Sequence, residues 1–165
     1  MRMLYLFTGL LLFISCNNQN ADPTENNNDS AKAEEAKIIS AFDLEPGFAE
    51  IDSLQVLFFD DPYGDSLRYT RFFSFVNSND SVLLNETKKH LQQPYTIKNA
   101  IDTCRSEGKI YLLTKGEPVK TLYFSSRCPE CCYTYFIKDG SYYYFDLNEF
   151  FREKLSVLKK NGKKN

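Results

Sequence analysis

Residues 109–146 read KIYLLTKGEPVKTLYFSSRCPECCYTYFIKDGSYYYFD, and this stretch decides the fold. Runs rich in aromatic and β-branched residues predict strands, bounded by turn residues. Four such runs follow one another: 109–114, 119–125, 132–138 and 141–146. Gly116 with Pro118 predicts a turn after the first run, and Asp139-Gly140 is a strong two-residue hairpin signal before the last. We therefore expect a four-stranded antiparallel meander.

Outward from the meander, the chain predicts a hairpin and two helices. Alternating apolar residues indicate strands at 51–59 and 67–76. Helical spacing with N-capping residues indicates helices at 82–92 and 147–158. Residues 95–102 fit either an irregular crossing or a short helix. The prediction is a single α+β domain with a mainly antiparallel sheet, in the order ββα, meander, C-terminal helix, and with the helices packed on one side.

The predicted register decides which side chains share a face of the meander. We expect Thr114 opposite Val119, Lys138 opposite Ser141, and Ser125 opposite Cys132 in the middle pair. The first face then holds Tyr111, Leu113, Leu122, Phe124, Tyr133, Tyr135, Ile137, Tyr142 and Tyr144. The second face holds Ile110, Leu112, Val119, Tyr123, Phe136, Tyr143 and Phe145.

Neither face of this predicted sheet is polar, although an antiparallel sheet usually has one face exposed to solvent. We expect the final helix to cover the first face. The second face needs the N-terminal hairpin, a dimer partner or a ligand. If it stays open, Tyr123, Phe136, Tyr143 and Phe145 are its candidates for binding a protein or glycan partner. Cover from within the chain is the alternative.

The N-terminal residues indicate export and a lipid anchor. Arg2 precedes an apolar run at 4–14 that is short for a membrane span, and the run ends in Leu-Phe-Ile-Ser before Cys16. This segment resembles the signal of bacterial lipoproteins of the Gram-negative cell envelope. In that family the cysteine is acylated, with chains such as palmitate, and becomes the new N-terminus. An ordinary signal peptide or an anchor helix is the alternative.

This resemblance implies a domain order and a location. Residues 1–15 are then a signal peptide, and residues 16–37 are the lipidated cysteine and a polar, asparagine-rich tether. Residues 38–160 form the folded domain, and 161–165 are a basic tail. The lipid bilayer is the first expected partner, through acylated Cys16. The expected location is the cell envelope, on the periplasmic side or at the outer membrane.

Charge excludes a nucleic-acid partner. Residues 38–151 carry sixteen acidic and eleven basic side chains, so the body of the domain is mildly acidic. Six basic residues against one acidic residue follow in 152–165. This basic end either touches anionic lipid headgroups or is a frayed, solvated terminus, and we expect the second. His90, the one histidine of the chain, is predicted to lie on the surface of its helix.

Four cysteines remain after Cys16, an even number in an oxidising compartment, which predicts disulfides. Extending the first hairpin register places Cys104 beside Cys128, and Cys131 or Cys132 are alternative partners of Cys104. Because Cys131 and Cys132 are adjacent, we expect at least one thiol to stay free or to pair between chains.

A thiol-dependent function is the competing hypothesis. The Cys128-Pro129-Glu130-Cys131 motif is similar to that of thioredoxin-type oxidoreductases, where it opens a helix. Here a strand follows instead. A zinc site made from all four cysteines is also conceivable. No nucleophile, phosphate-binding or metalloprotease motif is present in the sequence, so we predict no catalytic residue, no cofactor and no metal.

Overall fold

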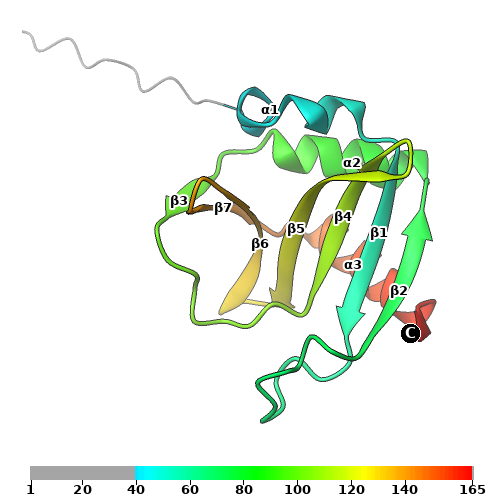
Figure 1. Ribbon diagram of the computed structural model, residues 1–165, viewed down its shortest axis with the longest axis vertical. Coiled ribbons are helices and arrows are strands. Elements are labelled where there is room, and N and C mark those ends of the chain that lie inside the picture. The colour runs from blue at the N-terminus through cyan, green and yellow to red at the C-terminus, as the bar shows by residue number, and fades with distance from the viewer. Residues whose placement is uncertain (1–39, 165) are drawn as a thin grey trace, which may run out of the picture. The chain divides into compact units, whose positions relative to one another are not determined.

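The computed structural model describes residues 40–164, which form one antiparallel sheet with helices against one face (Figure 1). The α+β class expected from the sequence is confirmed. The helices are α1 Ala41–Leu44, the 3-10 helix η1 Pro46–Glu50, α2 Ser81–Leu91 and α3 Glu149–Lys160. The strands are β1 Ser53–Phe59, β2 Phe73–Ser78, β3 Thr96–Lys98, β4 Gly108–Thr114, β5 Glu117–Arg127, β6 Cys131–Lys138, β7 Ser141–Asp146 and β8 Lys163–Lys164.

The meander and the N-terminal hairpin belong to the same sheet, whose strand order is β3-β7-β6-β5-β4-β1-β2-β8. Pairing of β1 with β4 joins the two parts. The second strand of the hairpin, predicted at 67–76, begins only at Phe73. Two edge strands also differ from the predictions. Residues 96–98, expected to be irregular or helical, pair with β7. Lys163 and Lys164, expected in a frayed tail, pair with β2. Both are only two or three residues long, too short to leave a strand pattern in the sequence.

Two helices begin at side chains that cap their first turns. The Asp80 carboxylate accepts a hydrogen bond from the Leu83 amide (2.9 Å) at the start of α2. The Asn148 side chain accepts one from the Phe151 amide (2.8 Å) at the start of α3. These bonds satisfy donors that a helix N-terminus otherwise leaves free. The two helices are thereby fixed at the ends where they leave the sheet.

The register of the meander is confirmed in its last hairpin and shifted in the other two. Lys138 lies opposite Ser141, as predicted. Thr114 lies opposite Glu117 instead of Val119, because Lys115 and Gly116 both have positive φ and form a two-residue turn. The pairing then shifts between Leu112 and Leu113, which leaves Val119 bulged.

The middle pair is also shifted by one residue, with Cys132 opposite Ser126 instead of Ser125. A shift of one residue moves every side chain of a strand to the other face. The predicted faces of β4, β6 and β7 are therefore right relative to one another, and β5 alone is inverted. Leu122 and Phe124 lie in the core beneath the helices, and Tyr123 lies on the opposite face of the sheet.

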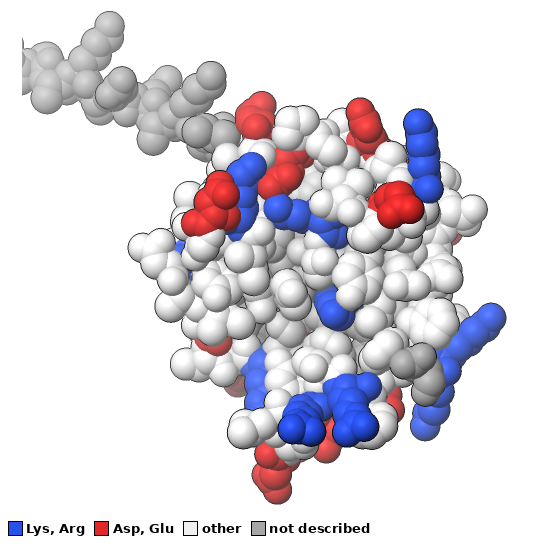
Figure 2. Space-filling view, viewed as in Figure 1, with Lys and Arg blue, Asp and Glu red and all other residues white. Residues whose placement is uncertain are grey.

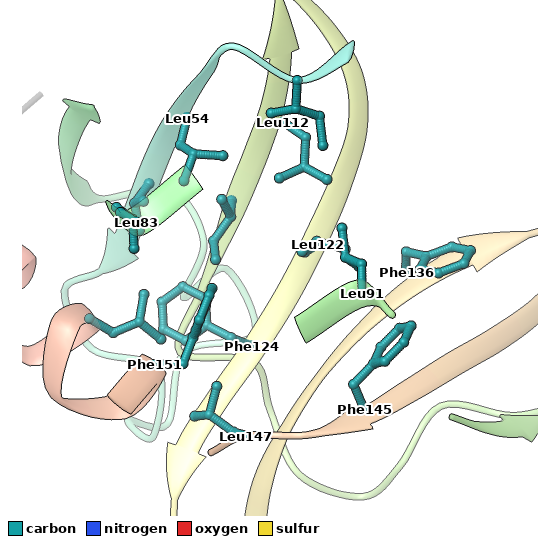
Figure 3. Packing of buried hydrophobic residues seen from close by; sticks show 14 of the residues in the cluster. Leu54, Leu83, Leu91, Leu112, Leu122, Phe124, Phe136, Phe145, Leu147 and Phe151 are labelled. Carbon is teal, nitrogen blue, oxygen red and sulfur yellow. The ribbon is translucent and has the colours of Figure 1, made fainter. Parts of the chain in front are cut away.

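The hydrophobic core lies between the helices and the face of the sheet that carries Ile110, Leu112 and Phe136 (Figure 3). The prediction that the final helix covers the tyrosine-bearing face is thus wrong. Phe151 and Leu155 of α3 pack into this core instead. Burying Phe, Ile and Leu costs no hydrogen bond, whereas each buried tyrosine hydroxyl needs a partner. The less polar face therefore takes the helices.

His90 is buried in this core, so its predicted place on the surface is wrong. Its side chain is 0% exposed, and its ring stacks on Phe151 with 4.9 Å between centroids. Its Nε2 atom lies 2.7 Å from the hydroxyl oxygen of Thr134, another buried side chain. Burial lowers the pKa of His90 to about 4, and the charge of Asp146 opposes this shift only in part.

Candidate functional site

Five tyrosines gather on the face of the sheet that the helices leave free. We name Tyr123, Tyr133, Tyr135, Tyr142 and Tyr144 the tyrosine cluster. Its rings lie close together: Tyr123 stacks on Tyr135 at 5.0 Å, and the Tyr135 and Tyr144 centroids are 4.9 Å apart. Tyr133 meets Tyr144 edge to face at 5.1 Å. Contacts of this kind favour aromatic pairs beyond the area that they bury.

Residues 99–107, which we call the strap, lie over part of the tyrosine cluster and join β3 to β4 past the ends of β6 and β5 (Figure 1). Three tyrosine hydroxyls hold it. Tyr133 donates to the carbonyl of Cys104 (3.1 Å), and the Asp102 amide donates to the Tyr144 hydroxyl (2.9 Å). The Tyr135 and Ser106 hydroxyls are 3.2 Å apart. Burial raises the pKa of all three hydroxyls, to about 12 for Tyr135, so they stay protonated at neutral pH.

The C-terminal end of the strap is held by the Glu107 carboxylate. It accepts hydrogen bonds from the Ser126 amide (3.0 Å), the Ser126 hydroxyl and the Tyr63 hydroxyl (2.6 Å). Burial alone would raise the pKa of Glu107, but these hydrogen bonds hold it below its usual value. Glu107 is therefore an ionised anchor that ties the strap to β5 and to the 60–72 loop. The same carboxylate lines a cavity of about 460 Å³ beside α3.

The four cysteines among residues 40–164 form two disulfides, and both connect to the start of β6. Cys104 of the strap pairs with Cys131, with Cα atoms 6.0 Å apart. Cys128 pairs with Cys132, with Cα atoms 4.6 Å apart. Disulfides were predicted, but the preferred pairing of Cys104 with Cys128 is wrong, and the alternative with Cys131 is the one observed. The prediction of a free thiol among the four is also wrong.

Strand geometry explains how two adjacent cysteines serve two disulfides. Successive residues of a strand point to opposite faces of the sheet. Cys131 therefore lies with the tyrosine cluster, where it meets the strap, and Cys132 packs against the hydrophobic core. No strained ring between neighbours is needed, because each sulfur finds its partner on its own side of β6.

The two disulfides also bear on the thiol hypotheses. Cys128 and Cys131 belong to different disulfides, and a strand rather than a helix begins at Cys131. The thioredoxin-like arrangement, with both cysteines at a helix N-terminus, is thus not formed. The sulfurs required for a zinc site are bonded to one another, and within residues 40–164 no group of three His, Cys, Asp or Glu residues is placed to hold a metal ion.

Part of the tyrosine-bearing face remains open beyond the strap. Tyr123 and Tyr142 are half-buried, and Ile137 between them is 41% exposed. A shallow cavity of about 300 Å³ lies over Thr121, Tyr123 and Ile137, among others. Figure 2 shows that side chains without charge dominate the middle of this face, with most charged groups near its margin. We call Tyr123, Ile137 and Tyr142 the open patch.

Of the four residues predicted to form a binding face, only Tyr123 belongs to the open patch. Phe136 and Phe145 are 0% and 1% exposed in the core, where Figure 3 shows them next to each other near Leu91 of α2. Tyr143 packs against the same core and stacks on Phe136 at 4.8 Å. The prediction of an exposed face is therefore wrong for Phe136 and Phe145, and Tyr143 is half-buried on the core side of the sheet. The predicted register placed Ile137 and Tyr142 on the same face, as observed. That face, however, was expected to lie beneath the final helix.

The N-terminal predictions concern other parts of the chain. Cys16, the signal segment and the tether lie outside the described residues. Among residues 40–164, no helix is both long and apolar enough to cross a membrane. No family model, no curated protein and no solved structure matches this chain. Any functional conclusion must therefore come from the residues themselves.

Proposed function

We propose that this protein is a lipoprotein of the bacterial cell envelope whose domain binds a partner protein through the open patch. Cys16 carries the lipid, and residues 17–37 connect it to the domain. The observation that carries the binding role is the aromatic face opposite the helices, which keeps Tyr123, Ile137 and Tyr142 accessible to solvent.

The composition of the open patch supports binding by contact rather than by charge. Tyrosine offers a large apolar surface and a hydroxyl at little conformational cost, because only two side-chain torsions become fixed. Ile137 adds an exposed apolar side chain, on a face whose middle has few charges. Sugars stack on aromatic rings through their C–H faces but gain little from an isoleucine, so the patch favours a protein over a glycan.

The lipid anchor is tested by replacing Cys16 with alanine. Acyl chains hold a protein at a membrane without a spanning helix, and two chains are needed for stable anchoring. We expect the natural protein to fractionate with membranes and its N-terminal peptide to carry acyl mass on Cys16. The C16A protein should carry no acyl chains and should keep its uncleaved signal segment.

The N-terminus of the natural protein separates a lipid anchor from its alternatives. Membrane association with the full N-terminal sequence and no acyl mass on Cys16 would contradict the lipoprotein proposal and favour an anchor helix. A secreted protein cleaved elsewhere, with an unmodified Cys16, would favour an ordinary signal peptide. The matched control is Ser15→Ala, a conservative change beside the cysteine that keeps the lipid attachment residue.

A further inference from the structure

The Cys104–Cys131 disulfide forms part of the wall of an open cavity of about 420 Å³. The cavity lies between the strap and the 60–72 loop, and its lining includes Arg105, Arg127 and Asp65. Cys104 is half-buried and Cys131 is buried, so the cavity is the route by which a small reagent approaches this disulfide.

The cavity beside this disulfide is cationic. Arg105 donates to the carbonyl of Gly64 (2.7 Å), and the Arg127 guanidinium lies over the Tyr63 ring, 5.2 Å from its centroid. Within residues 40–164, neither arginine has a carboxylate within ion-pair distance. Asp65 offsets one of the two charges. Positive side chains beside a sulfur stabilise thiolates, both an attacking one and a leaving one.

The second disulfide has a different environment. Cys132 packs against the hydrophobic core, next to Leu147. The Cys128–Cys132 bond also closes a short loop between residues four apart, so its opening frees no distant segment. The Cys104–Cys131 bond, by contrast, joins residues 27 apart and fastens the middle of the strap to β6.

We propose that Cys104–Cys131 is a reducible latch, opened by a dithiol reductant that enters the cationic cavity, and that its opening uncovers the tyrosines beneath the strap. This regulation rests on the proposed function, because it enlarges the surface that contacts the partner. Tyr133, Tyr135 and Tyr144 are buried while the strap is closed. Once the strap lifts, they extend the open patch along β6 and β7.

The chemistry is a two-electron exchange. A thiolate of the dithiol attacks the Cys104 sulfur, the Cys104–Cys131 bond breaks, and Cys131 leaves as a thiolate that takes up a proton. The second thiol of the reductant, after losing its proton, attacks the sulfur of its own first thiol in the mixed disulfide. Cys104 is then released and protonated. The reductant ends as a cyclic or intramolecular disulfide, and the protein holds two new thiols.

After reduction, only hydrogen bonds and one ion pair hold the middle of the strap. They are the three tyrosine hydroxyl bonds, the bonds from Arg105 to the carbonyls of Gly64 (2.7 Å) and Pro62 (3.4 Å), and an exposed ion pair between Lys98 and Asp102 (2.7 Å). Exposed ion pairs contribute little to stability. Glu107 still fixes the C-terminal end of the strap, so this end acts as the hinge.

To test the latch, the whole chain is treated with increasing concentrations of dithiothreitol. Free thiols are then alkylated and located by mass spectrometry. We expect Cys104 and Cys131 to react at least about tenfold faster than Cys128 and Cys132, because the cavity admits the reagent and its cations stabilise the thiolates. Amide hydrogen exchange in residues 99–107 should rise about tenfold once this bond is open. Arg127→Gln, a change at an exposed side chain, should slow the opening about threefold at low salt and less at high salt.

Two double variants provide a matched comparison. Cys104→Ser with Cys131→Ser should give fast exchange in the strap without any reductant, whereas Cys128→Ser with Cys132→Ser should leave the strap protected. Reduction of Cys128–Cys132 first, or a strap that stays protected in the first variant, would overturn the latch. The thiol mapping and the hydrogen exchange can both be measured without the partner protein. Capture of a partner by the open patch is measured separately, so a failed latch and a failed proposed function give different results.

Discussion

Replacing Phe136 with alanine is expected to lower the free energy of unfolding by about 3–5 kcal/mol, the usual cost of truncating a buried phenylalanine. Phe136 is 0% exposed. Its ring meets Phe48 edge to face at 5.5 Å and stacks on Tyr143 at 4.8 Å, so the truncation removes contacts to η1 and to β7 together. Urea denaturation of the F136A chain, with disulfides intact, measures the loss.

Tyr123→Ala is the matched control, because Tyr123 lies on the other face of the same sheet. Its ring is half-buried and stacks on Tyr135, so we expect a loss of about 1 kcal/mol. Equal losses for the two variants would contradict the assignment of the two faces. A larger loss for Tyr123 would place the core on the face that the register assigns to the tyrosine cluster.

Acid is expected to destabilise the domain through His90. Its pKa is about 4 in the folded protein, below the ordinary value of 6.5, because burial disfavours the charged imidazole. The unfolded chain therefore takes up a proton first as the pH falls below about 6.5. The free energy of unfolding therefore falls between about pH 6.5 and pH 4, and the decrease approaches about 3 kcal/mol at pH 4.

The control for this prediction is His90→Phe, which keeps a planar ring between Phe145 and Phe151 and removes the titrating group. Carboxylates also titrate below pH 5, so the informative quantity is the difference between the two proteins. We expect the natural protein to lose more stability than the variant between pH 7 and pH 4.5. Parallel stability curves over this range would contradict the buried, neutral histidine.

The strands, the order of the elements and the last hairpin were predictable from local sequence. Asp139 and Gly140 both have positive φ, which is the geometry that this dipeptide favours. The capping residues near Asp80 and Asn148 likewise mark their helices. These features depend on a few neighbouring residues, so the sequence states them directly.

The faces of β5 were not predictable, because they depend on one residue of register. The tight turn at Lys115-Gly116 and the bulge at Val119 have no strong signal, yet together they invert β5. Burial of His90 depends in the same way on distant partners, Thr134 and Phe151. A single histidine on a helix gives no sign of which residues it will meet.

The cysteine pairing lies between these two cases. Adjacent cysteines on a strand must point to opposite faces, so Cys131 and Cys132 were bound to seek different partners once β6 was recognised as beginning there. This alternation of side chains along a strand could have been applied to the sequence alone. Which of them meets Cys104 depends on the path of the strap, and only the structure shows that path on the tyrosine-bearing side.

Site-specific photocrosslinking in intact cells tests the central claim, that the open patch binds a partner protein. A benzoyl-phenylalanine residue is placed at Tyr123 or, as the control, at Val157, an exposed position on α3. We expect a discrete protein adduct from position 123 and none from position 157. Adducts from position 157 alone, equal adducts from both, or a carbohydrate adduct from position 123 would contradict it.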